Sequence, residues 1–87
     1  MQVVKQATAG TLESSDVMIT VKPYEKGIQI EIKSDVASQF GEEIKKVIKN
    51  TVKNMEVNNI YVKANDKGAL DYAIRARTET AILRACQ

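Results

Sequence analysis

The sequence predicts a single small α+β domain, because two stretches alternate apolar and polar side chains and a third repeats apolar residues at helical spacing. The alternating stretches are residues 17–22 and 28–33, and the helical stretch is 36–55. A chain of 87 residues forms one domain. The predicted order of elements is β-β-α-β-β-α, an antiparallel sheet packed by a long helix and a C-terminal helix.

Residues 1–16 show no sustained period, so we predict a flexible N-terminal segment ahead of a domain that spans residues 17–87. Within this segment, Gly10–Asp16 is a short run of mostly small or polar residues. Such a run is typical of an exposed loop. Its two serines, Ser14 and Ser15, carry hydroxyls, and Glu13 and Asp16 carry carboxylates.

The first two strands share one pattern, in which every second residue is apolar. Val17, Ile19 and Val21 fall on one face of the first strand, and three isoleucines do the same in residues 28–33. The intervening residues 23–27 contain Pro and Gly, which favour a turn. The pattern therefore predicts a hairpin with one buried face.

The long helix is predicted to begin after Ser34 or Asp35, either of which can cap it. Its apolar residues recur at spacings of three and four and form one stripe: Val36, Phe40, Ile44, Val47, Ile48, Thr51 and Met55. Lysines occupy the polar side, at positions 45, 46, 49 and 53. We interpret them as a solvated face, the alternative being a docking surface for an acidic partner.

The C-terminal part begins with a strand at 60–64 and a turn at Asn65–Gly68. Residues 69–76 are ambiguous, because their apolar side chains fit both a strand and a helix. We predict a strand over 69–76 that pairs with 60–64, followed by a helix over 77–86. The alternative is one long helix that begins at Ala69.

The composition argues against an independent enzyme. The chain lacks histidine, the commonest general base and zinc ligand, and it has one cysteine, Cys86, so we expect no metal site. No glycine-rich loop between a strand and a helix offers a phosphate cradle. A net charge of +2 is too small to favour nucleic acid, and no apolar run is long enough for a membrane helix. The single cysteine suggests a reducing, cytoplasmic location.

Two further groups of side chains have both a structural and a functional interpretation. Arg75, Arg77 and Arg84 could hold phosphates, but we favour the interpretation that they are surface arginines that cover apolar neighbours. Cys86 has no histidine to activate it, and we take it as incidental. On residues alone, Ser14 and Ser15 are loop serines that hydrogen-bond locally, or one of them is an exposed point of covalent attachment.

The run Ala9–Val17 resembles the N-terminal signature of the citrate lyase acyl carrier protein, or gamma chain. Three further blocks agree in type and position: Ser38–Gly41, Asn65–Asp71, and the tail from Ile74–Arg77 to Arg84–Ala85. The resemblance thus covers nearly the whole chain. Common acyl carrier proteins are helical bundles with an Asp-Ser-Leu motif, which this chain lacks, so their fold is not expected here.

The resemblance implies a carrier that is not catalytic on its own. A serine of the family carries 2'-(5''-phosphoribosyl)-3'-dephospho-CoA through a phosphodiester, and that serine corresponds to Ser14, with Ser15 as the alternative. The implied partners are a prosthetic-group transferase, the alpha (acyl transferase) subunit and the beta (citryl lyase) subunit of citrate lyase. The arm's thiol would hold acetyl and citryl thioesters while citrate is cleaved to oxaloacetate and acetate.

Three other functions remain open at this point. The chain could be the carrier of a related complex, such as citramalate lyase or malonate decarboxylase. It could also be a protein-interaction module without any modified serine. A small RNA-binding domain is the third alternative, against which the low net charge and the few aromatic residues weigh.

Overall fold

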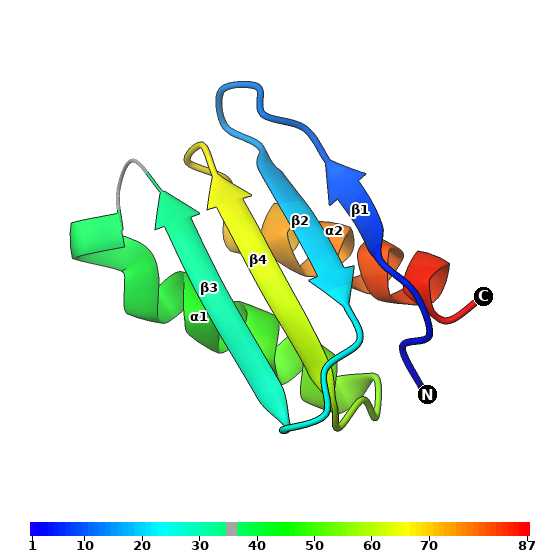
Figure 1. Cartoon of the computed structure of the whole chain (residues 1–87). Coiled ribbons are helices and arrows are strands. Elements are labelled where there is room, and N and C mark those ends of the chain that lie inside the picture. Colours follow the sequence, from blue (N-terminus) through cyan, green and yellow to red (C-terminus); the bar gives the residue numbers. More distant parts are fainter. Residues whose placement is uncertain (35–36) are drawn as a thin grey trace.

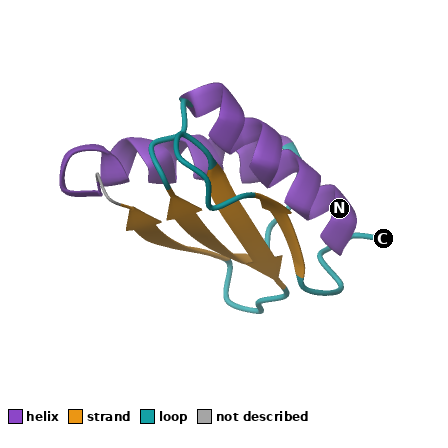
Figure 2. Ribbon diagram, turned by 90° about the horizontal axis from the view of Figure 1, so that it is seen from above, coloured by secondary structure: helices purple, strands orange, loops and turns teal. Residues whose placement is uncertain are grey.

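The computed structural model describes residues 1–34 and 37–87, with side chains for 1–34 and 40–87. In this part of the chain the elements are β1 (Ala7–Gly10), β2 (Val17–Lys22), β3 (Ile28–Ser34), α1 (Ala37–Asn54), β4 (Ile60–Asp66) and α2 (Asp71–Ala85). The strands form one sheet, and both helices cover the same face of it (Figure 1; Figure 2). The prediction of one small α+β domain that is not a helical bundle is confirmed.

The sheet has the strand order β1-β2-β4-β3. β4 lies between β2 and β3, and it pairs antiparallel with β2 and parallel with β3. β1 pairs antiparallel with the other side of β2. The carboxyl end of β1, the start of β2 and the carboxyl end of β4 therefore meet at one end of the sheet (Figure 1).

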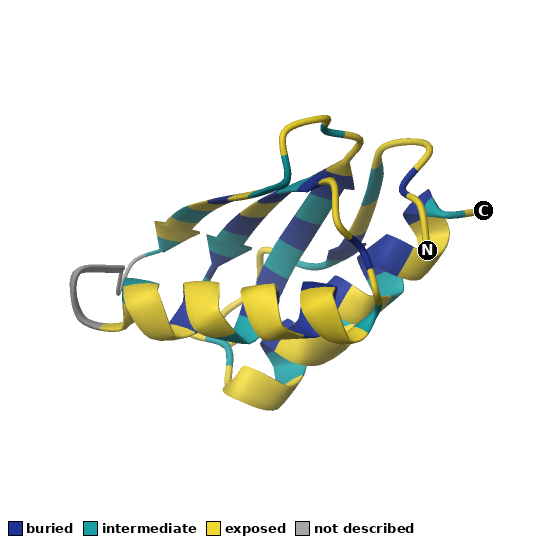
Figure 3. Cartoon of the chain, turned by 90° about the horizontal axis from the view of Figure 1, so that it is seen from below, coloured by how far each residue is buried: buried dark blue, intermediate teal, exposed yellow. Residues whose placement is uncertain are grey.

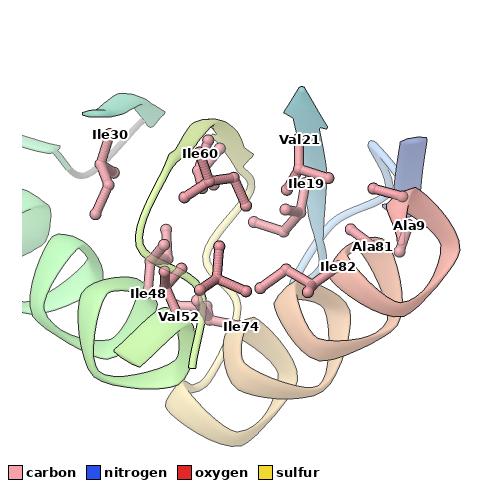
Figure 4. Packing of buried hydrophobic residues seen from close by; sticks show 14 of the residues in the cluster. Ala9, Ile19, Val21, Ile30, Ile48, Val52, Ile60, Ile74, Ala81 and Ile82 are labelled. Carbon is pink, nitrogen blue, oxygen red and sulfur yellow. The ribbon is translucent and has the colours of Figure 1, made fainter. Parts of the chain in front are cut away.

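The core lies between the sheet and the helices. Figure 3 shows that each helix turns its buried side toward the sheet and leaves the opposite side exposed. Ile48 and Val52 of α1 and Ile74, Ala81 and Ile82 of α2 are fully or almost fully buried and point into this layer (Figure 4). Burying one large aliphatic side chain stabilises the fold by about 1.5–3 kcal/mol, so this layer holds the sheet and helices together.

The predicted hairpin between residues 17–22 and 28–33 is wrong, because β4 separates β2 from β3. β3 reaches its neighbour β4 through α1, the kind of crossover that parallel strands require, and the sheet is mixed instead of antiparallel. Both central strands present fully buried side chains to the helices, whereas Ile28 and Ile32 of β3 are only half-buried. The alternating pattern gives each strand its buried face but does not specify which strands are neighbours.

The predicted strand over residues 69–76 is also wrong, because α2 begins at Asp71 and the element order is β-β-β-α-β-α. Of the side chains that alternate in this stretch, Leu70 and Tyr72 are 63% and 64% exposed. The buried residues of α2 follow a helical period instead: Ile74, Thr78, Ala81, Ile82 and Ala85. The alternative of one long helix, which begins two residues later than Ala69, is the one that the structure adopts.

The fourth strand comes from the N-terminal segment. Residues 7–10 form β1, and Val3 and Ala9 are buried in the core. The mobility predicted for residues 1–16 and the division at residue 17 stay predictions. Within the described part of the chain, no helix has the length and apolar character needed to cross a membrane.

The stripe on α1 is confirmed in its central part, where Ile44, Ile48 and Thr51 are buried. Phe40 is an exception, because it is 53% exposed. Val36 and the proposed cap Asp35 lie outside the described residues. Thr51 is buried without an energetic penalty, since its hydroxyl donates to the Val47 carbonyl at 2.8 Å.

Candidate functional site

Ser14 and Ser15 lie at the tip of the loop between β1 and β2. The Asp16 amide donates to the Glu13 carbonyl at 3.1 Å, so Glu13–Asp16 is a β-turn with the two serines at its centre. We call these four residues the serine turn. Ser15 has a φ of +66°, whereas Ser14 has an ordinary negative φ. A positive φ at the third position alone is the feature of a type II turn.

The two serine side chains are exposed, and neither hydroxyl forms a hydrogen bond to the described residues. They differ in their main chains. The Ser15 amide donates to the Lys67 carbonyl at 2.8 Å, whereas the Ser14 amide forms no hydrogen bond to the described residues. The serine turn is thus attached to its neighbour through the amide of Ser15 and not through that of Ser14.

The neighbour is the loop that follows β4. Besides the bond from Ser15, the Lys67 amide donates to the Asp16 carbonyl at 2.8 Å. These two bonds continue the pairing of β2 with β4 beyond the ends of the strands, where Val17 already faces Asp66. The serine turn is therefore built onto the sheet and does not stand apart from it.

The Asp16 carboxylate accepts four hydrogen bonds within and beside the loop. Its Oδ2 accepts from the Thr11 hydroxyl at 2.6 Å and from Arg77 Nη2 at 2.9 Å, and its Oδ1 accepts from Arg77 Nε at 3.2 Å and from the Val17 amide at 2.7 Å. The Thr11 hydroxyl in turn accepts from the Glu13 amide at 3.1 Å. We call Thr11, Asp16 and Arg77 the loop clamp.

The hydrogen bonds from Arg77 lower the pKa of Asp16 from 3.8 to about 2, with smaller contributions from the Thr11 hydroxyl and the Val17 amide. A carboxylate with so low a pKa and four hydrogen bonds is a poor general base. Ser14 therefore has no activating group in the clamp. The chemistry that this site offers is an accessible hydroxyl that another enzyme can use as an acceptor.

Replacing Arg77 by glutamine is expected to lower the free energy of unfolding at pH 7 by about 1–2 kcal/mol, allowing for solvent screening of the partly exposed guanidinium. The pKa of Asp16 is lower in the folded than in the unfolded chain, so this stabilisation is complete above about pH 4 and is lost as the pH falls toward 2. Urea denaturation of both proteins between pH 2 and 7 measures the difference.

The matched control is Arg75→Gln, which removes an exposed arginine of the same helix that pairs with Glu79 at 4.0 Å. It should change stability by at most a few tenths of a kcal/mol at any pH. A deficit in the Arg77→Gln protein that stays constant down to pH 2 would show that the Asp16 carboxylate is not the source of the stabilisation.

The other candidate residues lie elsewhere. Lys45, Lys46, Lys49 and Lys53 are exposed on α1, which is compatible with both a solvated face and a docking surface. Arg84 donates to the Thr8 carbonyl at 2.7 Å, and the half-buried Cys86 packs against the core. Of the three arginines, Arg77 alone is placed beside the serine turn by the contacts of the described residues.

The sequence does not indicate that Asp16 and Arg77 of the loop clamp lie in contact. Asp16 and Arg77 belong to two of the four blocks that carry the family resemblance, but 61 positions separate them. Asn65–Gly68 is predicted as a tight turn, and its pattern gives no sign that Asp66 is almost fully buried. The side chains of Ser38 and Gln39, from another of those blocks, lie outside the described residues.

The chain matches, over residues 4–85, a family model described as malonate decarboxylase delta subunit (MdcD). Citrate lyase acyl carrier protein of Halothermothrix orenii is 61% identical over 85 residues, which are 98% of this chain and 90% of that protein. The chain belongs to the citrate lyase acyl carrier protein family. The citrate lyase acyl carrier protein of Cronobacter sakazakii is 52% identical to this chain over 87 residues, which are all of this chain and 90% of that protein.

A solved structure of a Pseudomonas malonate decarboxylase hetero-tetramer in complex with malonate contains a chain of the same fold, with a TM-score of 0.82. The similarity covers 95% of this chain and 86% of that one, at 17% sequence identity. At so low an identity the match supports the fold alone. The fold of this family is thus the sheet covered by two helices, and the resemblance found in the sequence is confirmed.

Proposed function

We propose that this chain is the acyl carrier subunit of citrate lyase and that Ser14 carries its prosthetic group through a phosphodiester. The observation that carries the proposal is the position of Ser14, whose exposed hydroxyl lies on a turn that two main-chain hydrogen bonds attach to the loop after β4. Relatives with 48–61% identity are named citrate lyase acyl carrier protein, which favours citrate as the substrate of the complex. The carrier itself performs no catalytic step.

Ser14 is preferred to Ser15 for a geometric reason. A modifying enzyme must enclose the acceptor hydroxyl, and the Ser14 main chain makes no hydrogen bond to the described residues that would place a neighbouring loop against it. Ser15 is held by its amide bond to Lys67 and by its left-handed φ, a conformation that costs a non-glycine residue about 1–2 kcal/mol. Ser15 remains the alternative acceptor.

The residues around Ser14 fit the proposed group, 2'-(5''-phosphoribosyl)-3'-dephospho-CoA. An added phosphodiester is anionic, and two carboxylates flank the serines in sequence. The bidentate pair with Arg77 neutralises the charge of Asp16, which leaves the exposed Glu13 as the remaining source of repulsion. When bound, the group supplies a thiol that holds acetyl and citryl thioesters.

The part that this chain plays is to hold and present the arm. A tethered thioester reaches a high effective concentration at each active site that the arm can reach, without any new contact by the carrier. We propose that those active sites belong to the alpha and beta subunits, and that a prosthetic-group transferase loads the arm. A cytoplasmic location is part of the same proposal.

Two alternatives differ in testable ways. A carrier of citramalate lyase or malonate decarboxylase would be modified too, but it would support cleavage or decarboxylation of a different acid; the names of the similar relatives favour citrate. A protein-interaction module would never be modified. We do not favour it, because it gives no reason for two exposed serines on a turn held by a charged clamp.

Intact mass spectrometry of the chain co-expressed with the transferase tests the proposal. We expect the mass of one phosphoribosyl-dephospho-CoA group on the wild-type protein and on Ser15→Ala, and no added mass on Ser14→Ala. The Ser15→Ala protein is the matched control, because it changes the same atoms one residue away. A wild-type protein that stays unmodified would exclude the carrier function, and modification of Ser14→Ala but not of Ser15→Ala would move the site to Ser15.

A further inference from the structure

The loop that carries Ser14 has little hydrophobic packing to hold it. Leu12 is 50% exposed, and residues 12–15 are all exposed. Fixing the backbone of such a loop has an entropic cost at every residue, and apolar burial does not offset it here. The order of the loop must therefore come from its polar contacts, which are the two main-chain bonds to Lys67 and the loop clamp.

The clamp joins the two ends of the loop. Thr11 is the residue directly after β1, and Asp16 is the residue directly before β2. The 2.6 Å bond between their side chains closes the loop across its base, and the bond from the Glu13 amide to the Thr11 hydroxyl fixes the first residue of the serine turn. The Thr11 hydroxyl thus donates to Asp16 and accepts from the Glu13 amide.

Arg77 connects this closed loop to the rigid part of the molecule. It lies in the middle of α2, between the buried residues Ile74 and Thr78. Its guanidinium binds both oxygens of Asp16, and its side chain passes beside Gly10, where a Cβ atom would lie 3.3 Å from Arg77 Cδ. A planar fork bound at two points fixes orientation as well as distance, which a lysine cannot do.

We propose that Thr11, Asp16 and Arg77 are positioning residues that hold the serine turn in the conformation that the prosthetic-group transferase recognises. This inference rests on the proposed function and adds the residues that determine how well Ser14 is presented. The clamp contributes no group to the reacting atoms. It keeps the turn in one conformation, so that binding by the transferase does not have to select a minor one.

The kinetic signature follows from this role. If the competent conformation falls to about a tenth of the population when the clamp is broken, the apparent affinity for the transferase falls about tenfold. The chemistry within the bound complex is unchanged. Arg77→Ala should therefore raise the KM for the carrier about tenfold and leave kcat within about twofold, measured by intact mass against time with purified transferase and its activated phosphoribosyl-dephospho-CoA donor.

Three variants separate positioning from a general effect of losing a side chain. Arg84→Ala removes another arginine of α2, one that contacts the Thr8 carbonyl and not the serine turn, and it should be modified like the wild type. Thr11→Val removes the hydroxyl at nearly constant volume and should raise KM severalfold. Thr11→Ser restores the hydroxyl and should recover most of the loss.

Heteronuclear {¹H}–¹⁵N NOE values provide a readout that does not depend on modification. In Arg77→Ala the values at Leu12 and Ser14 should fall well below those of the strands, while the amide signals of the sheet and helices keep their wild-type positions. Signals lost throughout the spectrum would instead mean that the variant is unfolded, and the Thr11 pair then decides the question, because it leaves α2 intact.

The outcomes distinguish the inference from the function it rests on. A wild-type chain that is never modified contradicts the proposed function. A wild-type chain that is modified, together with Arg77→Ala and Thr11→Val proteins that keep the wild-type KM and NOE values, overturns the clamp and leaves the carrier function untouched. A fall in kcat at unchanged KM would also overturn it, because that pattern belongs to a group that acts on the reacting atoms.

Discussion

Replacing Gly10 by alanine should lower the free energy of unfolding by about 3 kcal/mol or more, because the added methyl group has no space in the fold. A Cβ atom at this position would lie 1.9 Å from the Val17 carbonyl oxygen, inside any permitted contact. Gly10 also has a φ of +97°, which L-residues rarely adopt. Relief of the clash requires the end of β1 to move away from the start of β2.

Gly27→Ala separates the clash from the backbone strain. Gly27 has nearly the same φ, +94°, but a Cβ there would meet nothing within 4 Å. Its replacement should lower the stability by about 1 kcal/mol, the cost of the left-handed conformation alone. Thermal unfolding followed by circular dichroism measures both variants, and a loss of about 3 kcal/mol corresponds to a Tm lower by roughly 12–24 °C in a domain of this size.

Equal losses in the two glycine variants would show that β1 can shift without cost, which would contradict the close approach at Gly10. The same movement would displace the loop that begins one residue later. We therefore expect Gly10→Ala to be modified more slowly than Gly27→Ala when both are folded. A glycine at the last position of β1 is thus a requirement of the fold that also serves the site.

The sequence predicts features that depend on neighbouring residues, such as the buried face of a strand, better than features that depend on distant residues, such as strand order. The buried faces of β2 and β4 follow directly from alternation, because Val17, Ile19, Ile60 and Val62 are all fully buried. The order of the strands in the sheet does not, since a pattern with a period of two is the same beside any neighbour. The hairpin prediction is wrong because a short loop at residues 23–27 does not require the strands that it joins to pair with each other.

The error at residues 69–76 has a different origin. Four apolar side chains at every second position suggested a strand, but only Ile74 among Leu70, Tyr72, Ile74 and Ala76 is buried. The other three are exposed, which is compatible with a helix and not with the interior of a sheet. Short apolar runs do not distinguish the two structures, and both positions beside β4, with which this strand is predicted to pair, are occupied by β2 and β3.

The sequence predicts the exposed serine turn but not the contacts that the turn makes with residues far away in the chain. An exposed turn with two free hydroxyls follows from small, polar neighbours, and the structure has that turn. The contact of Asp16 with Arg77 depends on how α2 lies across the sheet, which no local pattern specifies. The contact between the serine turn and Lys67 likewise depends on the pairing of β2 with β4.

Asp66→Ala is expected to lower the free energy of unfolding by about 3 kcal/mol, because it removes an acceptor that three donors share. Asp66 is 1% exposed, and its Oδ2 accepts from the Ser34 hydroxyl at 2.9 Å and the Gly68 amide at 3.1 Å. Its Oδ1 accepts from the Ala69 amide at 3.0 Å. Leaving buried donors without a partner costs about 1–3 kcal/mol for each of them, less where water can enter.

The effect should extend to the serine turn, because Asp66 shapes the loop whose next residue, Lys67, binds Ser15 and Asp16 through its main chain. Urea denaturation at pH 7 measures the stability, and Asp71→Ala provides the matched control. Asp71 is an exposed aspartate in the first turn of α2, so its loss should cost only about 0.3–1 kcal/mol through the helix dipole. Asp66→Asn should fall between the two alanine variants, since an amide keeps one of the two acceptor oxygens. If Asp66→Ala were no less stable than Asp71→Ala, the buried carboxylate could not be what holds the end of β4 and the serine turn together.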